Sequence, residues 1–228
     1  MILQALFEES LNEKWFTKEV IPSIEEWYRD QHSKNRFVLF HAGPYLFNKF
    51  DNSKLSKENN LGYHFARDYN LLSHILKAKF SEERGYFYLY SVDVWGMNFF
   101  PSIEDTEDHN EFYLDDYLIF RYNNLREYLS ITWRNRIEEV MDEVRSIDQH
   151  RNASEFTEQV NIRLSMKYDV GFAKKAIIES GYHGYKYRNE FENEGVDDTL
   201  SYVIFRDFSK DINILDTLTI SSDGVTRS

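Results

Sequence analysis

Cysteine is absent from all 228 residues of the chain. Disulfide bonds, thiolate metal ligands and a cysteine nucleophile are therefore excluded. The sequence also lacks an apolar run long enough to span a bilayer, and its first residues lack the basic segment and apolar core of a secretory signal. We therefore expect a cytoplasmic protein that does not associate with membranes, because a cysteine-free composition suits a reducing compartment.

Several motifs that carry chemistry are also missing. No histidine pair has the H-x-x-x-H or H-E-x-x-H spacing of a zinc site, and neither G-x-x-x-x-G-K nor G-x-S-x-G occurs. We expect no metal cofactor, no phosphate-binding loop of that kind and no serine nucleophile turn. Repeats, low-complexity tracts and linkers rich in Pro or Ser are missing too. Residues 1–228 are therefore expected to form a single domain.

Positive charge is scarce, and the net charge of −12 argues against a broadly basic nucleic-acid surface. The charge is nevertheless uneven, because residues 121–151 contain six arginines whereas residues 104–116 contain no Lys or Arg. The arginine-rich stretch suits either a groove for a phosphate backbone or an exposed helix with i,i+4 ion pairs. The helix interpretation is favoured by the acids in the same stretch, Glu138, Glu139, Asp142 and Glu143.

Aromatic side chains are abundant, with 16 Tyr and 18 Phe, and they indicate extensive aromatic packing. Residues 85–94 form the clearest strand pattern, with Tyr86, Tyr88 and Tyr90 on one face and Phe87 and Leu89 on the other. Further strands are predicted at residues 38–41, 61–66, 185–187, 201–205 and 212–215. Helices are predicted near Leu11, from Ser23, after Asp68, and at residues 113–148, 156–166 and 170–180, the last ending at Gly181. Strands at both ends of a helical middle predict an α+β fold.

The segment RFVLFHAGP at residues 36–44 is the stretch on which the functional interpretation depends. Its apolar residues predict a buried strand that ends at His41, followed by a turn at Ala42, Gly43 and Pro44. Small residues after a strand let backbone N–H groups approach a ligand. A lone histidine in such a place is more often structural than catalytic, so this segment alone does not decide between the two roles.

Four ordered pieces of the sequence resemble one family. FHAGP resembles the His-Gly-Thr-Pro segment of bacterial and phage ADP-ribosyltransferase-like domains. FDNSKLSKENNLGYHFA is similar to the stretch that follows this segment in those domains. SGYHGYKYRNEFENEGVDDTLSYVIFRD and KDINILDT look like their closing segments. The matched pieces cover residues 37–94 and 171–217. The resemblance implies a split, twisted β-sheet core related to the histidine-tyrosine-glutamate transferases, with an N-terminal helical segment and residues 113–166 as a helical insertion.

The resemblance also implies a site for NAD as co-substrate. His41 would hydrogen-bond a ribose hydroxyl, while the backbone at Ala42 and Gly43 would hold the carboxamide. The side chains expected to stack on nicotinamide are Tyr63, His64 and Phe65. Three departures matter. Ala42-Gly43 replaces Gly-Thr, and His64 stands where many relatives have the tyrosine that packs on nicotinamide. Ser201 stands where chain-building polymerases have glutamate. Transfer of single ADP-ribose units is therefore expected.

A carboxylate beside the ribose would stabilise the positive charge that develops when the glycosidic bond breaks. The candidates are Glu190, Glu192 and Glu194, which alternation in an extended segment places on one face. The family match favours Glu192, with Glu190 second. The alternative is an acidic solvated loop, because residues 190–198 contain five acids and no base.

The function expected from these observations is an NAD-dependent mono-ADP-ribosyltransferase, of the toxin or phage-conflict effector type. Its partners would be NAD, a macromolecular acceptor (protein, RNA or DNA) and a neutralising antitoxin. Residues 113–166, with Arg134 and Arg136, are expected to recognise the acceptor. The alternative is a non-catalytic binding module that kept the fold and lost the acid.

Overall fold

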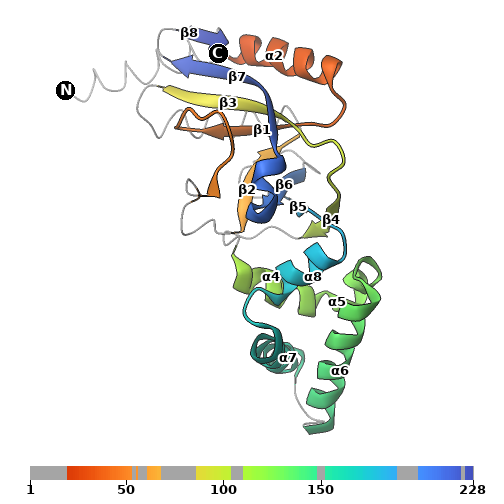
Figure 1. Cartoon of the computed structure of the whole chain (residues 1–228). Coiled ribbons are helices and arrows are strands. Elements are labelled where there is room, and N and C mark those ends of the chain that lie inside the picture. Colours follow the sequence, from red (N-terminus) through yellow and green to blue (C-terminus); the bar gives the residue numbers. More distant parts are fainter. Residues whose placement is uncertain are drawn as a thin grey trace, which may run out of the picture.

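A computed structural model describes residues 20–52, 55, 61–67, 86–103, 110–147, 152–188, 200–221 and 224–227. It has a mixed α/β architecture with an eight-stranded sheet (Figure 1). The strands are β1 (Val38–Gly43), β2 (Gly62–Ala66), β3 (Tyr86–Asp93), β4 (Phe99–Ile103), β5 (Gly184–Arg188), β6 (Leu200–Phe205), β7 (Asn213–Ser221) and β8 (Gly224–Arg227). The helices are α2 (Ile21–Lys34), α4 (Glu111–Phe120), α5 (Tyr122–Leu125), α6 (Ile131–Ile147), α7 (Ala153–Tyr168) and α8 (Phe172–Glu179), with short 3-10 turns at Arg126–Tyr128 and Arg206–Asp211.

The sheet consists of two halves that meet at one residue pair. Its strand order is β4-β5-β6-β2-β1-β3-β7-β8. β1 pairs with β3 from Val38 to Gly43, but it is paired with β2, among the described residues, at Phe40 and Ala66 alone. Beyond this pair, the last three residues of β1 lie beside β2 but form no strand pairing with it. The sheet is therefore split between its two central strands.

Helix α2 covers the half formed by β1, β3 and β7. Pro22 lies in its first turn, where the missing N–H costs nothing. The buried Ile24 and Trp27 pack on Phe40 and Leu89 of the sheet. This face of the sheet is the one that Phe40 and Leu89 share, so the residues that alternate with them point to the opposite face.

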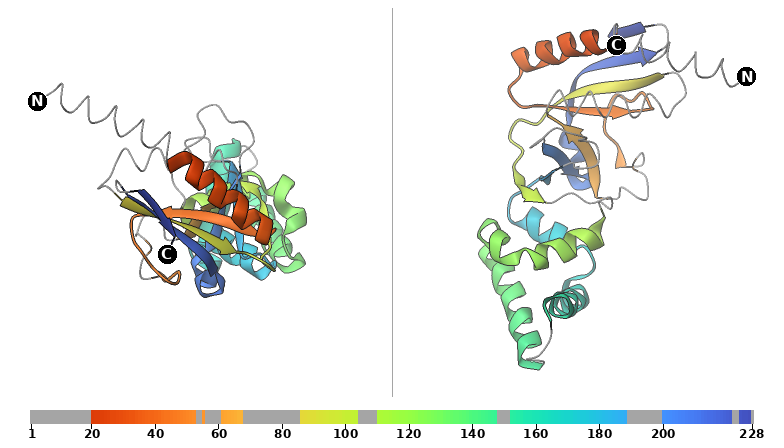
Figure 2. Two further views of the ribbon diagram at one scale, coloured as in Figure 1. Left: turned by 90° about the horizontal axis from the view of Figure 1, so that it is seen from above. Right: turned by 180° about the vertical axis from the view of Figure 1, so that it is seen from behind.

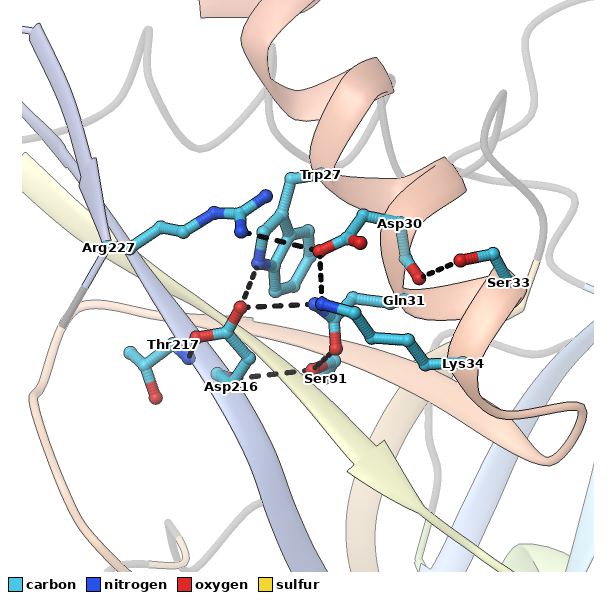
Figure 3. A network of polar contacts seen from close by, with 9 residues as sticks. All are labelled: Trp27, Asp30, Gln31, Ser33, Lys34, Ser91, Asp216, Thr217 and Arg227. Atoms are coloured by element: carbon cyan, nitrogen blue, oxygen red, sulfur yellow. Dashed lines mark hydrogen bonds and ion pairs between the residues drawn. The ribbon is translucent and has the colours of Figure 1, made fainter.

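A buried polar network fixes α2 on the sheet (Figure 3). The carboxylate of Asp216 accepts hydrogen bonds from Trp27 Nε1 at 2.8 Å and Gln31 Nε2 at 3.0 Å. Ser91 donates to Gln31 Oε1 at 2.8 Å, which links the helix to β3 as well. Because these groups satisfy one another, the network determines the position of the helix without leaving an unpaired polar group among its members.

Helices α4 to α8 lie between β4 and β5 in the sequence and form a second helical layer. Figures 1 and 2 show them at the opposite end of the molecule from α2. The apolar stripe of α6 faces this layer, since Trp133, Ile137, Val140 and Val144 are all buried. They share a core with Phe100 of β4 and Tyr185 of β5. Helix α8 ends before Gly181, whose φ of +90° fits the predicted stop.

Several boundaries differ from the sequence prediction. β1 runs through Ala42 and Gly43, so His41 lies inside the strand and the turn begins only at Pro44. Strand β4 was not predicted because it contains Pro101, which a strand tolerates at the sheet edge that β4 occupies. The predicted 113–148 helix is divided into α4, α5 and α6. The sequence prediction also missed the short strand β8 and the part of β7 beyond Leu215. The helices predicted near Leu11 and after Asp68 lie outside the described residues.

Candidate functional site

The candidate site surrounds His41 on the face of the sheet opposite α2. Alternation along β1 sends Phe40 toward α2 and His41 the other way, to the face occupied by Tyr90 of β3. We call this the aromatic face and define it by its buried rings. They are Phe50, Tyr63, Phe65, Tyr90 and Tyr202.

His41 bridges the split between the two half-sheets. Its Nδ1 atom lies 2.8 Å from the main-chain oxygen of His64 on β2. A carbonyl oxygen only accepts hydrogen bonds, so Nδ1 carries the proton. In the neutral ring Nε2 is then a hydrogen-bond acceptor. The side chain is half-buried, so the strand geometry presents a basic ring nitrogen at the break in the sheet.

Five aromatic rings lie around the His41 imidazole. Phe50 and Phe65 are closest, with ring centroids 5.5 Å from it. The others are Tyr63 at 6.0 Å, and Phe47 and Tyr90 at 6.2 Å. Sequence analysis missed Phe47, Phe50 and Tyr90 as site residues. The alternation of tyrosines in β3 predicted that Tyr90 lies on one face of the strand, without saying which. The pairing of His41 with Tyr90 shows that it is the face that carries His41.

Two tyrosine hydroxyls hold the chain that follows β1 over this cluster. Tyr90 donates to the Tyr45 carbonyl at 2.7 Å and accepts from the Phe47 N–H at 3.0 Å. Tyr63 makes the same pair of contacts with the carbonyl and N–H of Asp51. Burial raises the pKa of Tyr90 to about 12 and also raises the pKa of Tyr63. Both hydroxyls therefore remain protonated donors near neutral pH.

Gly43 contributes no side chain beside Nε2 of His41. It lies two residues further along β1, on the same face as His41. A Cβ atom placed on Gly43 would lie 3.4 Å from His41 Nε2. Any larger residue at position 43 would therefore place a side-chain atom beside that nitrogen.

Of the side chains predicted to stack on nicotinamide, the structure brings Tyr63 and Phe65 together with His41 but not His64. The His64 side chain points to the other face of β2, where its Nδ1 lies 3.0 Å from the Tyr187 hydroxyl. Alternation along β2 explains this, because His64 lies between Tyr63 and Phe65. The contribution of His64 to the site is its carbonyl oxygen.

The two arginines predicted to bind the acceptor lie on α6 and differ in their surroundings. The Arg136 guanidinium lies over the rings of Trp133 and Tyr168, at 4.8 and 5.2 Å. Its Nη1 is 3.5 Å from the Glu179 carboxylate, which also accepts from Trp133 Nε1. Arg136 is thus tied into the helical layer. Arg134 is two residues away and points to a different side of the helix, since successive helical residues turn by about 100°.

The predicted carboxylates Glu190, Glu192 and Glu194 lie outside the described residues. Within the described ranges, no group of three or more His, Asp or Glu side chains is placed to hold a metal ion. The helices that the structure describes include none both long and apolar enough to cross a membrane. Compared with family models, curated proteins and solved structures, the chain gives no match.

Proposed function

We propose that the chain binds NAD at His41 and transfers single ADP-ribose units to a macromolecular acceptor. The observation that carries the proposal is the position of His41, which bridges a split sheet within a cluster of aromatic rings. A split sheet of this kind is what the resemblance to ADP-ribosyltransferase-like domains implies. The ring cluster supplies the apolar wall that a nicotinamide ring requires.

The chemistry asks little of the protein beyond positioning and charge stabilisation. Nicotinamide leaves as a neutral base, so no general acid is needed, while positive charge develops on the ribose. In this proposal His41 Nε2 accepts a hydrogen bond from a ribose hydroxyl, and Tyr63 and Phe65 line the nicotinamide site. Ala42 and Gly43 do not pair with β2, so backbone groups on that side of β1 would bind the carboxamide.

Glu192, or Glu190 in its place, is proposed to stabilise the developing charge and to polarise the attacking nucleophile. The test is nicotinamide release from NAD by the wild type, Glu192→Gln and Glu190→Gln. Loss of a positioned carboxylate should slow release by about 10²-fold or more. Glutamine keeps most of the side-chain shape, so NAD binding should weaken far less. The variant that loses turnover identifies the acid, and equal rates in all three proteins would reject the catalytic proposal.

The second candidate is a non-catalytic module that binds NAD or a related nucleotide. The hydrogen bond from His41 to the His64 carbonyl favours it, because a purely structural histidine would make the same contact. Calorimetry separates the two: NAD binding without nicotinamide release supports the binding module, and binding with release supports the transferase.

The acceptor class, the effector role and a neutralising partner form part of the proposal. Helices α4 to α7 are proposed to recognise the acceptor, because they lie at the opposite end of the molecule from α2 (Figure 2) and residues 113–166 contain seven of the 14 arginines of the chain. Incubation with labelled NAD and cell extract, followed by separate protease and nuclease digestion, assigns the acceptor to protein or nucleic acid. Label that resists both treatments would contradict a macromolecular acceptor.

A further inference from the structure

Lys186 of β5 differs from the other lysines of the structure in its electrostatic surroundings. Among the described lysines, Lys174 and Lys186 are the two whose side chains are not exposed. Lys174 is paired twice, with Asp207 at 2.7 Å and Glu111 at 3.8 Å. No carboxylate among the described residues forms an ion pair with Lys186. Within the part of the chain that the structure describes, a half-buried ammonium group without a paired acid is unusual, given the net charge of −12.

The side chain of Lys186 projects from the same face as the candidate site. Its Nζ lies 6.0 Å from the centre of the Tyr202 ring, and Tyr202 belongs to the aromatic face. Phe99 packs on the same tyrosine with ring centroids 5.0 Å apart. The neighbouring residue Tyr187 points to the opposite face, toward His64. Lys186 therefore places a positive charge on the face of the sheet that carries the His41 cluster.

Strand register aligns Lys186 with the His41 cluster. Lys186 pairs with Tyr202, and Tyr202 pairs with Phe65, so the three residues form one row across β5, β6 and β2. Phe65 in turn contacts His41. With neighbouring strands about 4.8 Å apart, the row extends roughly 14 Å from β1 to β5. A ligand that touches both ends must be longer than nicotinamide with its ribose.

From these contacts we infer that Lys186 binds the diphosphate group of a dinucleotide whose nicotinamide end lies at His41. This inference rests on the proposed function and names a further binding residue for it. The ammonium group supplies positive charge, and charge-assisted hydrogen bonds to phosphate oxygens would satisfy it where no carboxylate of the described residues does. Tyr202 and Phe65, both buried, lie in the row between the two ends.

The test measures binding of ADP-ribose and of nicotinamide by calorimetry to four proteins. They are the wild type, Lys186→Met, Lys186→Arg and the control Lys175→Met, which removes an exposed lysine of α8. Methionine keeps the length of the side chain on Tyr202 and removes the charge. Loss of one charge-assisted contact should weaken ADP-ribose binding by about tenfold or more. Nicotinamide binding should not change, Lys186→Arg should restore most of the affinity, and Lys175→Met should behave as wild type.

The possible failures are distinguishable. If the wild type binds neither NAD nor ADP-ribose, the proposed function fails and this inference with it. If the wild type binds ADP-ribose and Lys186→Met binds it equally well, the inference about Lys186 alone is wrong. Equal losses for ADP-ribose and nicotinamide in Lys186→Met would also overturn it, because they would mean general damage to the aromatic face.

Discussion

The Nδ1 atom of His41 donates a hydrogen bond to the carbonyl oxygen of His64 across 2.8 Å, at the point where β1 and β2 stop pairing. A side chain thus takes the place of a ladder hydrogen bond between the two half-sheets. The bond fixes the tautomer of His41 and directs Nε2 away from the ladder, as an acceptor. The proposed chemistry depends on this contact, because it sets the tautomer of His41.

Gly43→Ala should impair NAD binding without unfolding the protein. The added methyl group would lie 3.4 Å from His41 Nε2, where it would occupy the approach of a ribose hydroxyl. We expect NAD affinity to fall by about tenfold, the equivalent of one lost hydrogen bond of about 1.4 kcal/mol. Calorimetry with NAD measures this, and the thermal midpoint serves as the folding control. Unchanged affinity would mean that no ligand group approaches Nε2 from this side.

Tyr90→Phe should loosen the chain that follows β1. The hydroxyl is the partner of the Tyr45 carbonyl and the Phe47 N–H, so its removal leaves two backbone groups without that contact. We expect a loss of about 1–3 kcal/mol in the free energy of unfolding, measured with urea. The matched control is Tyr202→Phe on the same face, because the Tyr202 hydroxyl has no hydrogen bond among the described residues. Equal losses in the two variants would contradict this role of Tyr90.

Asp115 should make stability depend on pH between about 4 and 6. This buried carboxylate of α4 accepts from the Gly171 and Ala173 N–H groups at 2.8 Å, and burial raises its pKa to about 6. The folded state therefore binds a proton that the unfolded state has released. The stability that this group contributes is present below pH 4 and is lost as the pH rises through 6.

The measurement compares wild type with Asp115→Asn at each pH. The difference in their free energies of unfolding should change by up to about 3 kcal/mol across this range, with the wild type losing stability as pH rises. Asp211→Asn, on an exposed 3-10 turn, is the control. A constant difference between wild type and Asp115→Asn would show that Asp115 titrates alike in both states.

Arg136→Ala and Arg134→Ala should have different consequences. Arg136 packs on Trp133 and Tyr168 and pairs with Glu179, so its removal should lower the thermal midpoint by several degrees, for a loss of about 1 kcal/mol. Arg134→Ala should leave the midpoint near that of wild type and weaken acceptor modification. If Arg134→Ala modifies the acceptor normally, α6 does not recognise it through this residue.

The aromatic content and periodicity of the sequence predicted most strands and the faces of β3. They did not predict β4, because Pro101 disfavours a strand until the edge position is known. Alternation along β2 places Tyr63 and Phe65 on the same face as His41 and places His64 on the other face. The sequence prediction nevertheless listed Tyr63, His64 and Phe65 together as residues that stack on nicotinamide. Phe47 and Phe50 reach the candidate site through the chain that follows β1, which the Tyr90 and Tyr63 hydroxyls hold in place. Lys186 is aligned with the site by strand order and register. Both are long-range properties that local sequence patterns do not carry.

The measurement that tests the central claim most directly is nicotinamide release from NAD by the wild type and by His41→Ala, with circular dichroism of both. If His41 holds the ribose at the split in the sheet, the wild type releases nicotinamide and His41→Ala loses turnover while its spectrum stays native. Native spectra with equal turnover in both proteins, or no release by the wild type, would contradict the assignment. Loss of the native spectrum in His41→Ala would make the hydrogen bond to His64 a structural contact.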